Sequence, residues 1–161
     1  MTTTIDRPLD KLIQTMSSPS LLHAITSRVI ESLRAMLESR RDIDLAVLFG
    51  SAATGTMRRG SDIDLALRWT GTEPGDKNSF FAELERALGR PVDVIDLALA
   101  PPQLRFEIAR NGVLLVERTK GEWSEAKARA FLDWWDFRPI AERVNRAAIE
   151  RLAGSTLDGS R

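Results

Sequence analysis

The stretch Leu45–Leu67, LAVLFGSAATGTMRRGSDIDLAL, decides the fold because it places two apolar strands on either side of a turn of small residues. The second strand begins with Asp62 and Asp64, two residues apart. Side chains alternate between the faces of a strand, so we expect both carboxylates on one face, a few ångströms apart. Two unit charges about 4 Å apart repel by roughly 4 kcal/mol at an effective dielectric of 20. The pair therefore requires either a retained proton or a divalent cation.

The pair Gly50-Ser51, between the two strands, favours the cation. It follows an apolar strand and is expected to open a helix, where free backbone N–H groups, the positive helix end and the hydroxyl can hold phosphate oxygens. Taken alone, a glycine-serine pair is equally typical of an ordinary strand-to-helix turn. Phosphate beside paired carboxylates indicates magnesium, so the two motifs together predict a magnesium-dependent phosphate site.

Composition limits the classes of protein that the chain can belong to. It has 161 residues, 43% of them apolar, which predicts one core in a single domain spanning residues 1–161. The 23 basic and 23 acidic residues cancel, so we expect neither direct nucleic-acid binding nor membrane binding. The sequence has no cysteine, no signal-peptide pattern and no apolar run of membrane-spanning length. These features predict a cytoplasmic protein.

The hydrophobic periodicity predicts helices alternating with strands, an α/β fold. The strand over 42–49 is apolar enough to be covered on both faces, as when helices pack over a sheet. We expect helices at about 9–16, 21–40, 78–88 and 103–110, and strands at 42–49, from Asp62, at 91–97 and through Val116.

The last third of the chain returns to a helical pattern. A helical tail is expected over about 122–153, and residues 155–161 are expected to be disordered. The tail's aromatic residues either pack on the domain's own sheet, which is slightly favoured, or form a surface for a partner. The apolar positions fall on two stripes, with Phe131, Trp134 and Trp135 before Pro139, and Ile140, Val144, Ala148 and Leu152 after it.

Gly50-Ser51, ten further residues and then Asp62-Ile63-Asp64 resemble the GSx10DxD signature of the DNA polymerase beta-type nucleotidyltransferase superfamily. Given its small size, the chain is most similar to the minimal nucleotidyltransferases (MNT), which include antitoxins of HEPN/MNT toxin–antitoxin pairs. The resemblance covers a core of about 42–117, with helical extensions at about 9–40 and 122–153. The chain departs from many members at Thr54, where they carry a basic residue, and at Arg59-Gly60, where they carry Pro-Asp.

The resemblance implies a mixed sheet of about four strands with packed helices, and a two-magnesium reaction. A nucleoside monophosphate, AMP if the donor is ATP, would pass from a nucleoside triphosphate to a hydroxyl, with release of pyrophosphate. Asp62 and Asp64 would bridge the two Mg²⁺ ions. Gly50 and Ser51 would hold the β and γ phosphates.

The family also carries a third aspartate on a neighbouring strand, which ligates one metal and helps to deprotonate the acceptor. Asp93 in PVDVIDL, residues 91–97, occupies that place. Asp96 lies on the opposite face of the same strand, and strand parity alone does not say which face meets the site.

The resemblance further implies a cognate HEPN-type toxin as the partner. From the aromatic residues and arginines of the helical tail, about Trp123 to Leu152, we expect the tail to bind part of it. The chain contains no tyrosine, so a tyrosine acceptor must belong to another molecule. No arginine precedes His23 at the spacing of the HEPN ribonuclease motif, so the toxin is expected to be a separate protein. Two alternatives stay open, a non-catalytic antitoxin that occludes its partner and a nucleotidyltransferase that acts on a small molecule.

Overall fold

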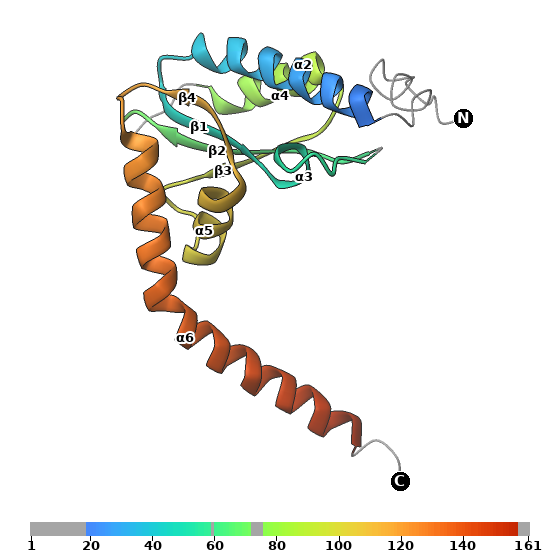
Figure 1. Cartoon of the computed structure of the whole chain (residues 1–161), viewed down its shortest axis with the longest axis vertical. Coiled ribbons are helices and arrows are strands. Elements are labelled where there is room, and N and C mark those ends of the chain that lie inside the picture. The colour runs from blue at the N-terminus through green and yellow to red at the C-terminus, as the bar shows by residue number, and fades with distance from the viewer. Residues whose placement is uncertain (1–18, 59, 72–75, 158–161) are drawn as a thin grey trace, which may run out of the picture.

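The structure is a computed structural model that describes residues 19–58, 60–71 and 76–157. The predicted alternation of helices and strands is present, with bounds that differ from the expected ones by no more than two residues before the tail (Figure 1). The helix expected over 9–16 lies outside the described residues. The elements are α2 (Pro19–Glu38), β1 (Ile43–Phe49), α3 (Gly50–Ala53), β2 (Ile63–Trp69), α4 (Lys77–Leu88), β3 (Val92–Asp96), α5 (Pro102–Asn111), β4 (Val113–Glu117) and α6 (Glu122–Leu157).

The four strands form one mixed sheet in the order β3-β2-β1-β4. Strand β1 pairs antiparallel with both β2 and β4, whereas β2 and β3 are parallel. The parallel pair is connected through α4, since parallel neighbours need a crossover. This mixed sheet with packed helices confirms the predicted fold class.

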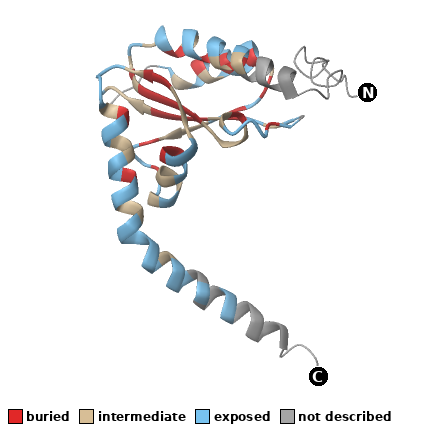
Figure 2. Cartoon of the chain, in the orientation of Figure 1, coloured by how far each residue is buried: buried red, intermediate tan, exposed pale blue. Residues whose placement is uncertain are grey.

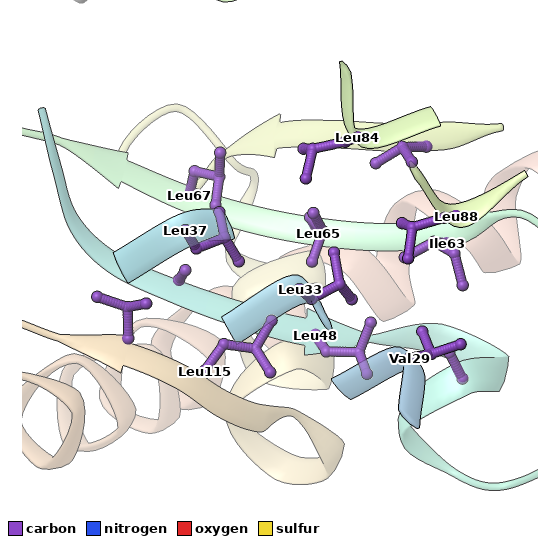
Figure 3. Close-up of a cluster of buried hydrophobic side chains, with 14 of the residues drawn as sticks. Val29, Leu33, Leu37, Leu48, Ile63, Leu65, Leu67, Leu84, Leu88 and Leu115 are labelled. Atoms are coloured by element: carbon purple, nitrogen blue, oxygen red, sulfur yellow. The ribbon is translucent and has the colours of Figure 1, made fainter. Parts of the chain in front are cut away.

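Helices cover both faces of the sheet, as Figures 1 and 2 show. Alternate residues of β1 point to the two sides: Ala46 and Leu48 meet α2 and α4, and Leu45 and Val47 face α5 and α6. Both-face coverage of this strand is therefore confirmed. Each fully buried leucine contributes about 1.5–3 kcal/mol relative to exposure. Figure 3 shows the larger core cluster, which includes Val29, Leu33, Leu37, Leu65, Leu84 and Leu88.

The tail is one continuous helix, α6, with Pro139 inside it. Figure 1 shows that α6 changes direction along its length, which is the expected effect of a proline that removes one i→i−4 hydrogen bond. The helix continues to Leu157, so the prediction of disorder from Ser155 was wrong for the three residues 155–157. Once a helix has formed, each added residue gains a hydrogen bond at little cost, and no proline stops it here. No helix in the described ranges has the length and apolarity to cross a membrane.

The aromatic residues of α6 differ in how far the domain buries them. Trp123 is buried in the core cluster beneath the sheet, and Trp134 stacks on Phe106 of α5 with the ring centroids 5.5 Å apart. Trp135 is 76% exposed. Packing on the domain therefore accounts for the first two tryptophans and not for the third.

Candidate active site

Two aspartates meet where β2 begins. Asp62 immediately precedes the strand and is exposed, and Asp64 is its second residue and is half-buried. Across the sheet, Asp64 pairs with Phe49 of β1 on one side and with Asp93 of β3 on the other. Directly paired residues project from the same face, so Asp93 lies beside Asp64. Asp64 and Asp93 are thereby brought side by side, and Asp62 lies two residues before Asp64 at the same end of β2.

Asp96 occupies a different environment from Asp93. It pairs with Leu67 in the register of β2 and β3, and its Oδ1 accepts a hydrogen bond from the backbone N–H of Ala98 at 2.9 Å. That bond closes the turn that follows β3. The structure thus gives Asp96 a structural role at the far end of the strand, while Asp93 stands next to Asp64.

The neighbouring carboxylates act on Asp64. Burial raises the pKa of the Asp64 carboxyl above its ordinary value, and the negative charges of Asp93 and Asp62 raise it further, in that order. A raised pKa means that the anion is disfavoured here in the absence of a compensating cation. The electrostatics of the cluster therefore favour the binding of a cation.

Gly50 sits directly against the Asp64 carboxylate. Its φ is +67°, and a Cβ at this position would overlap Oδ2 of Asp64. Only glycine has both the conformational freedom and the space for this position. The backbone of the turn after β1 is consequently held within contact distance of the acidic cluster.

The turn after β1 differs in one respect from the sequence-based expectation. The helix α3 that begins at Gly50 has only four residues, closed by hydrogen bonds from Thr54 N and Oγ1 to the Gly50 carbonyl at 3.2 and 3.1 Å. One helical turn adds little macrodipole, so phosphate binding there would depend on individual N–H groups and the Ser51 hydroxyl. Ser51 is half-buried, and its hydroxyl has no hydrogen-bond partner within the described ranges.

Arg90 is a buried residue of this region that the sequence did not single out. It is 3% exposed, and its Nη1 donates to the carbonyl of Ser61 at 3.0 Å. The N–H of Ile63 donates to the carbonyl of Pro91, also at 3.0 Å. Together these bonds tie the residues on either side of Asp62 to the start of β3. A charged residue placed between a helix-ending glycine and a proline was the available signal, since such a residue is seldom buried without a partner.

The residues fit magnesium in their chemistry. No three histidine, cysteine or acidic side chains of the described chain already converge into a closed metal site. Magnesium does not need one, because it is commonly held by one or two carboxylates together with substrate phosphates and water. Asp64, half-buried beside Asp93 and with a raised pKa, supplies the hard oxygen ligands and the unbalanced negative charge that such an ion would complete.

A cavity of about 320 Å³ lies elsewhere, at the end of β2 opposite the aspartates. Ala66, which is buried in the same cluster as Ile108 of α5, lies between Asp64 and the cavity-lining Arg68 along β2. Ion pairs balance the charges around it, with Arg68–Glu122 at 2.8 Å and Arg105–Asp133 at 3.1 Å, so the cavity is not a ready-made anion site. Its lining includes Arg68, Leu97, Arg105, Glu122, Trp123 and Arg129.

A family model described as Polymerase beta, Nucleotidyltransferase matches residues 31–121 of the chain. That span contains β1, α3, β2 and β3, and thus every residue of the acidic cluster and the Gly50 turn. Among curated proteins there was no significant match.

Several solved structures share the fold. A chain of a toxin–antitoxin complex crystallised with AMP-PNP has a TM-score of 0.65 at 22% identity, and the match covers 74% of this chain and 98% of that one. A chain from the complex of a tri-AMPylated Shewanella oneidensis HEPN toxin with its MNT antitoxin has a TM-score of 0.61 at 19% identity, with 77% and 98% covered. A chain of an MntA–HepT toxin–antitoxin complex gives 0.60 at 19%, with 76% and 98% covered. At these identities the likeness is one of fold.

Proposed function

The chain belongs to the polymerase beta nucleotidyltransferase family, and from this premise we propose that it transfers a nucleoside monophosphate from a triphosphate to a protein hydroxyl. The observation that carries the proposal is the position of Asp64, between Asp93 on the next strand and the glycine turn at Gly50. Acidic ligands and the backbone of the glycine turn therefore lie in contact at one place. ATP is the expected donor.

The chain's own residues have separable roles in the proposed reaction. The backbone at Gly50 and the Ser51 hydroxyl bind the β and γ phosphates. Asp62 and Asp64 would hold two Mg²⁺ ions and Asp93 would ligate one of them. When bound, the ions supply charge neutralisation on the attacking and leaving oxygens of an in-line displacement.

In the transfer step one bond to the α-phosphorus forms and one breaks. The acceptor oxygen forms a bond to the α-phosphorus, the bond from that phosphorus to the bridging oxygen breaks, and pyrophosphate leaves with the electron pair. The acceptor proton passes to Asp93, which is exposed at the edge of the cluster and can release it to water. Because Asp93 is paired in register with Asp64, the base stands next to the phosphate-binding face.

We further propose that the acceptor is a tyrosine of a cognate HEPN-type toxin and that the chain acts as its antitoxin. The support is of two kinds. The chain has no tyrosine of its own, and its fold is shared by a chain from a complex in which the HEPN toxin is tri-AMPylated. An antitoxin that only occludes its partner is the second candidate, favoured by the exposed apolar residues of α6.

The proposal is tested by incubating the purified chain with Mg²⁺, ATP and a purified HEPN-type toxin protein, and measuring AMP addition by intact-protein mass spectrometry. Asp62→Asn, Asp64→Asn and Asp93→Asn should each lower transfer by at least about a hundredfold, the range for a lost catalytic carboxylate. Asp96→Asn is the matched control and should stay active, because Asp96 serves the turn at Ala98.

The same assay separates the two candidate functions. If the Asp62→Asn/Asp64→Asn double variant still neutralises an unmodified toxin, the protein is an occluding antitoxin and the proposed chemistry is wrong. Loss of activity in Asp96→Asn but not in Asp93→Asn would instead reverse the assignment of the third carboxylate.

A further inference from the structure

Strand β3 forms one edge of the sheet. In the order β3-β2-β1-β4, and among the described residues, β3 pairs with β2 alone. An edge strand presents N–H and C=O groups that can pair with another chain, and proteins usually cover such groups. On the opposite edge strand, β4, the Nη2 of Arg34 covers the carbonyl of Leu114 with a hydrogen bond of 3.2 Å. Uncovered groups on β3 would mark a place where another chain can bind.

The register shows which backbone groups of β3 point outward. In a parallel pair, successive residues of a strand point their N–H and C=O groups alternately toward the neighbouring strand and away from it. The N–H of Leu97, just after β3, donates to the carbonyl of Leu67 in β2 at 2.8 Å, so the odd-numbered residues along β3 face β2. The even-numbered residues Val92, Val94 and Asp96 therefore direct their backbone groups to the outer edge.

The two ends of this outer edge are covered, and its middle is free. The Val92 N–H donates to Oε1 of Glu85 in α4 at 3.1 Å. The Asp96 carbonyl accepts from two N–H groups of the turn that follows β3, at 3.1 and 3.0 Å. Within the described part of the chain, four outward groups are left without a partner: the Val92 carbonyl, both groups of Val94 and the Asp96 N–H. This spacing matches one short extended segment.

The free edge lies beside the acidic cluster. Asp93 stands between Val92 and Val94, is exposed, and projects from the same face as Asp64, its partner in β2. A strand added at the edge would lie about 4.7–4.9 Å from β3. Its residue opposite Asp93 would project from that same face, because directly paired residues share a face. A hydroxyl on this residue would therefore meet Asp93 from the side opposite Asp64.

The neighbours of Asp93 indicate the chemistry of such a segment. Val94 is half-buried against the larger core cluster on one face, and Ile95 is half-buried on the face of Asp93, against the cluster that contains Trp123. An apolar side chain of the added strand would extend the packing on each face, since cross-strand apolar pairs stabilise a sheet. A row of backbone groups is satisfied by the backbone of a polypeptide, so a small-molecule acceptor does not match this edge.

We propose that the acceptor protein adds an extended segment to the free edge of β3, with its hydroxyl residue opposite Asp93 and apolar residues next to it. This inference rests on the proposed function for the reaction, and it deepens that function by assigning the acceptor class, a polypeptide bound as a strand. Backbone hydrogen bonds would supply affinity, and the position opposite Asp93 would select the residue that is modified.

The test compares two proline variants of the full chain, with a purified HEPN-type toxin protein as the acceptor. Val94→Pro removes an outward N–H without removing a bond to β2, and the proline ring obstructs the edge. At saturating Mg²⁺ and ATP, it should raise KM for the acceptor by roughly tenfold or more with kcat little changed, the sign of lost acceptor binding.

Lys120→Pro is the matched control for the proline itself. Lys120 is exposed and precedes Gly121, whose φ is +96°, in a turn closed by a hydrogen bond from Glu122 N to the Thr119 carbonyl. Proline is favoured at this position of such a turn. The KM of this variant for the acceptor should equal that of the wild type.

Hydrogen exchange on the wild-type chain gives a second measurement, which does not require a variant to fold. Exchange of the Val94 and Asp96 N–H groups should slow when the same toxin protein is added with Mg²⁺ and a non-hydrolysable ATP analogue. Unchanged exchange at both groups, or an unchanged KM in a folded Val94→Pro variant, would overturn the proposal. A wild-type dimer that Val94→Pro converts to monomers would also overturn it, because a second copy would then occupy the edge.

The failure of strand addition can be told apart from that of the proposed function. Slower exchange at Val94 and Asp96 without AMP transfer by the wild type would leave strand addition standing and remove the chemistry. AMP transfer by the wild type with a KM that Val94→Pro does not change would leave the chemistry standing and remove strand addition.

Discussion

Asp64 is held in an unfavourable electrostatic position by its neighbours on both sides. It is half-buried, it has Asp93 beside it in the sheet, and Asp62 precedes it by two residues. A site evolved only for stability would not keep three carboxylates together, because like charges at this spacing oppose folding. The arrangement is understandable if a bound cation is part of the working protein.

We expect Asp64→Asn to stabilise the metal-free protein at pH 7. The folded-state pKa of Asp64 is raised, so its contribution to stability is present below the unfolded pKa of about 3.9 and is lost as pH rises through the folded value. The amide carries no charge, so the variant's advantage in unfolding free energy should appear above that window and vanish below about pH 4. Urea unfolding at pH 3.5 and pH 7, without metal, measures it, and excess Mg²⁺ should stabilise the wild type only.

Gly50 offers a residue-level test of the contact between the turn and the carboxylate. Gly50 and Gly55 have nearly equal positive φ angles, +67° and +70°, but only a Cβ at Gly50 meets Asp64. Gly55→Ala should cost about 1–2 kcal/mol of unfolding free energy from backbone strain alone. Gly50→Ala should cost about 1–3 kcal/mol more from overpacking. Equal losses in the two variants, by urea denaturation, would show that the turn does not press on Asp64.

Spacing in the sequence predicted where the candidate site residues lie on the strands better than it predicted their surroundings. The positions of Asp62, Asp64 and Gly50 follow from strand parity and from the strand-to-turn boundary, both local properties. The burial of Arg90 could not be predicted, because it depends on the loop before β2 folding over the start of β3. Local patterns carry no information on such a contact between segments 29 residues apart.

At the scale of elements, the strands were predictable because each is an apolar run bounded by glycine, proline or polar residues. Helix α4 shows the same agreement: its start is capped by Asp76, which accepts from Ser79 N at 3.0 Å, and its end by Gly89 in the left-handed conformation. Helix α6 did not follow the local rule, since Pro139 was expected to separate two stripes. The helix continues on both sides of the proline, so the residues that flank Pro139 were sufficient to keep α6 continuous.

Arg90 connects the start of β3 to the loop before β2, so we expect its removal to destabilise both. Arg90→Met removes the donor to the Ser61 carbonyl, and leaving such a group unsatisfied costs about 1–3 kcal/mol. Arg86→Met is the control, because Arg86 is exposed in the last turn of α4 and surface changes stay within about 0.5 kcal/mol. Urea denaturation should separate the two variants. Faster hydrogen exchange at Ile63 in Arg90→Met would locate the loss at the start of β2.

At the scale of the whole molecule, the sheet separates the larger core cluster from the face that carries the candidate acidic site. Helices α2 and α4 bury the larger core on one face, and the aspartates share the other face with α5 and α6. Sequence could predict that both faces are covered, but not which helices share a face with Asp64, because that depends on strand order. The mixed order β3-β2-β1-β4 is what places Asp93 next to Asp64.

The first part of α6 packs on the core and on α5, whereas large apolar residues of its distal part are exposed. This difference gives a prediction for the whole chain. A variant that ends at Arg138 should keep its unfolding free energy within about 0.5 kcal/mol, because no deleted residue whose burial is described belongs to either core. Ending the chain at Gly121 should be far more harmful. It removes Trp123, 8% exposed, and Ala130, 4% exposed, and loss of a buried tryptophan alone costs about 3–5 kcal/mol. Thermal and urea unfolding of the two truncations give the comparison. A loss above about 1 kcal/mol in the shorter deletion would mean that the distal helix packs on the domain in solution.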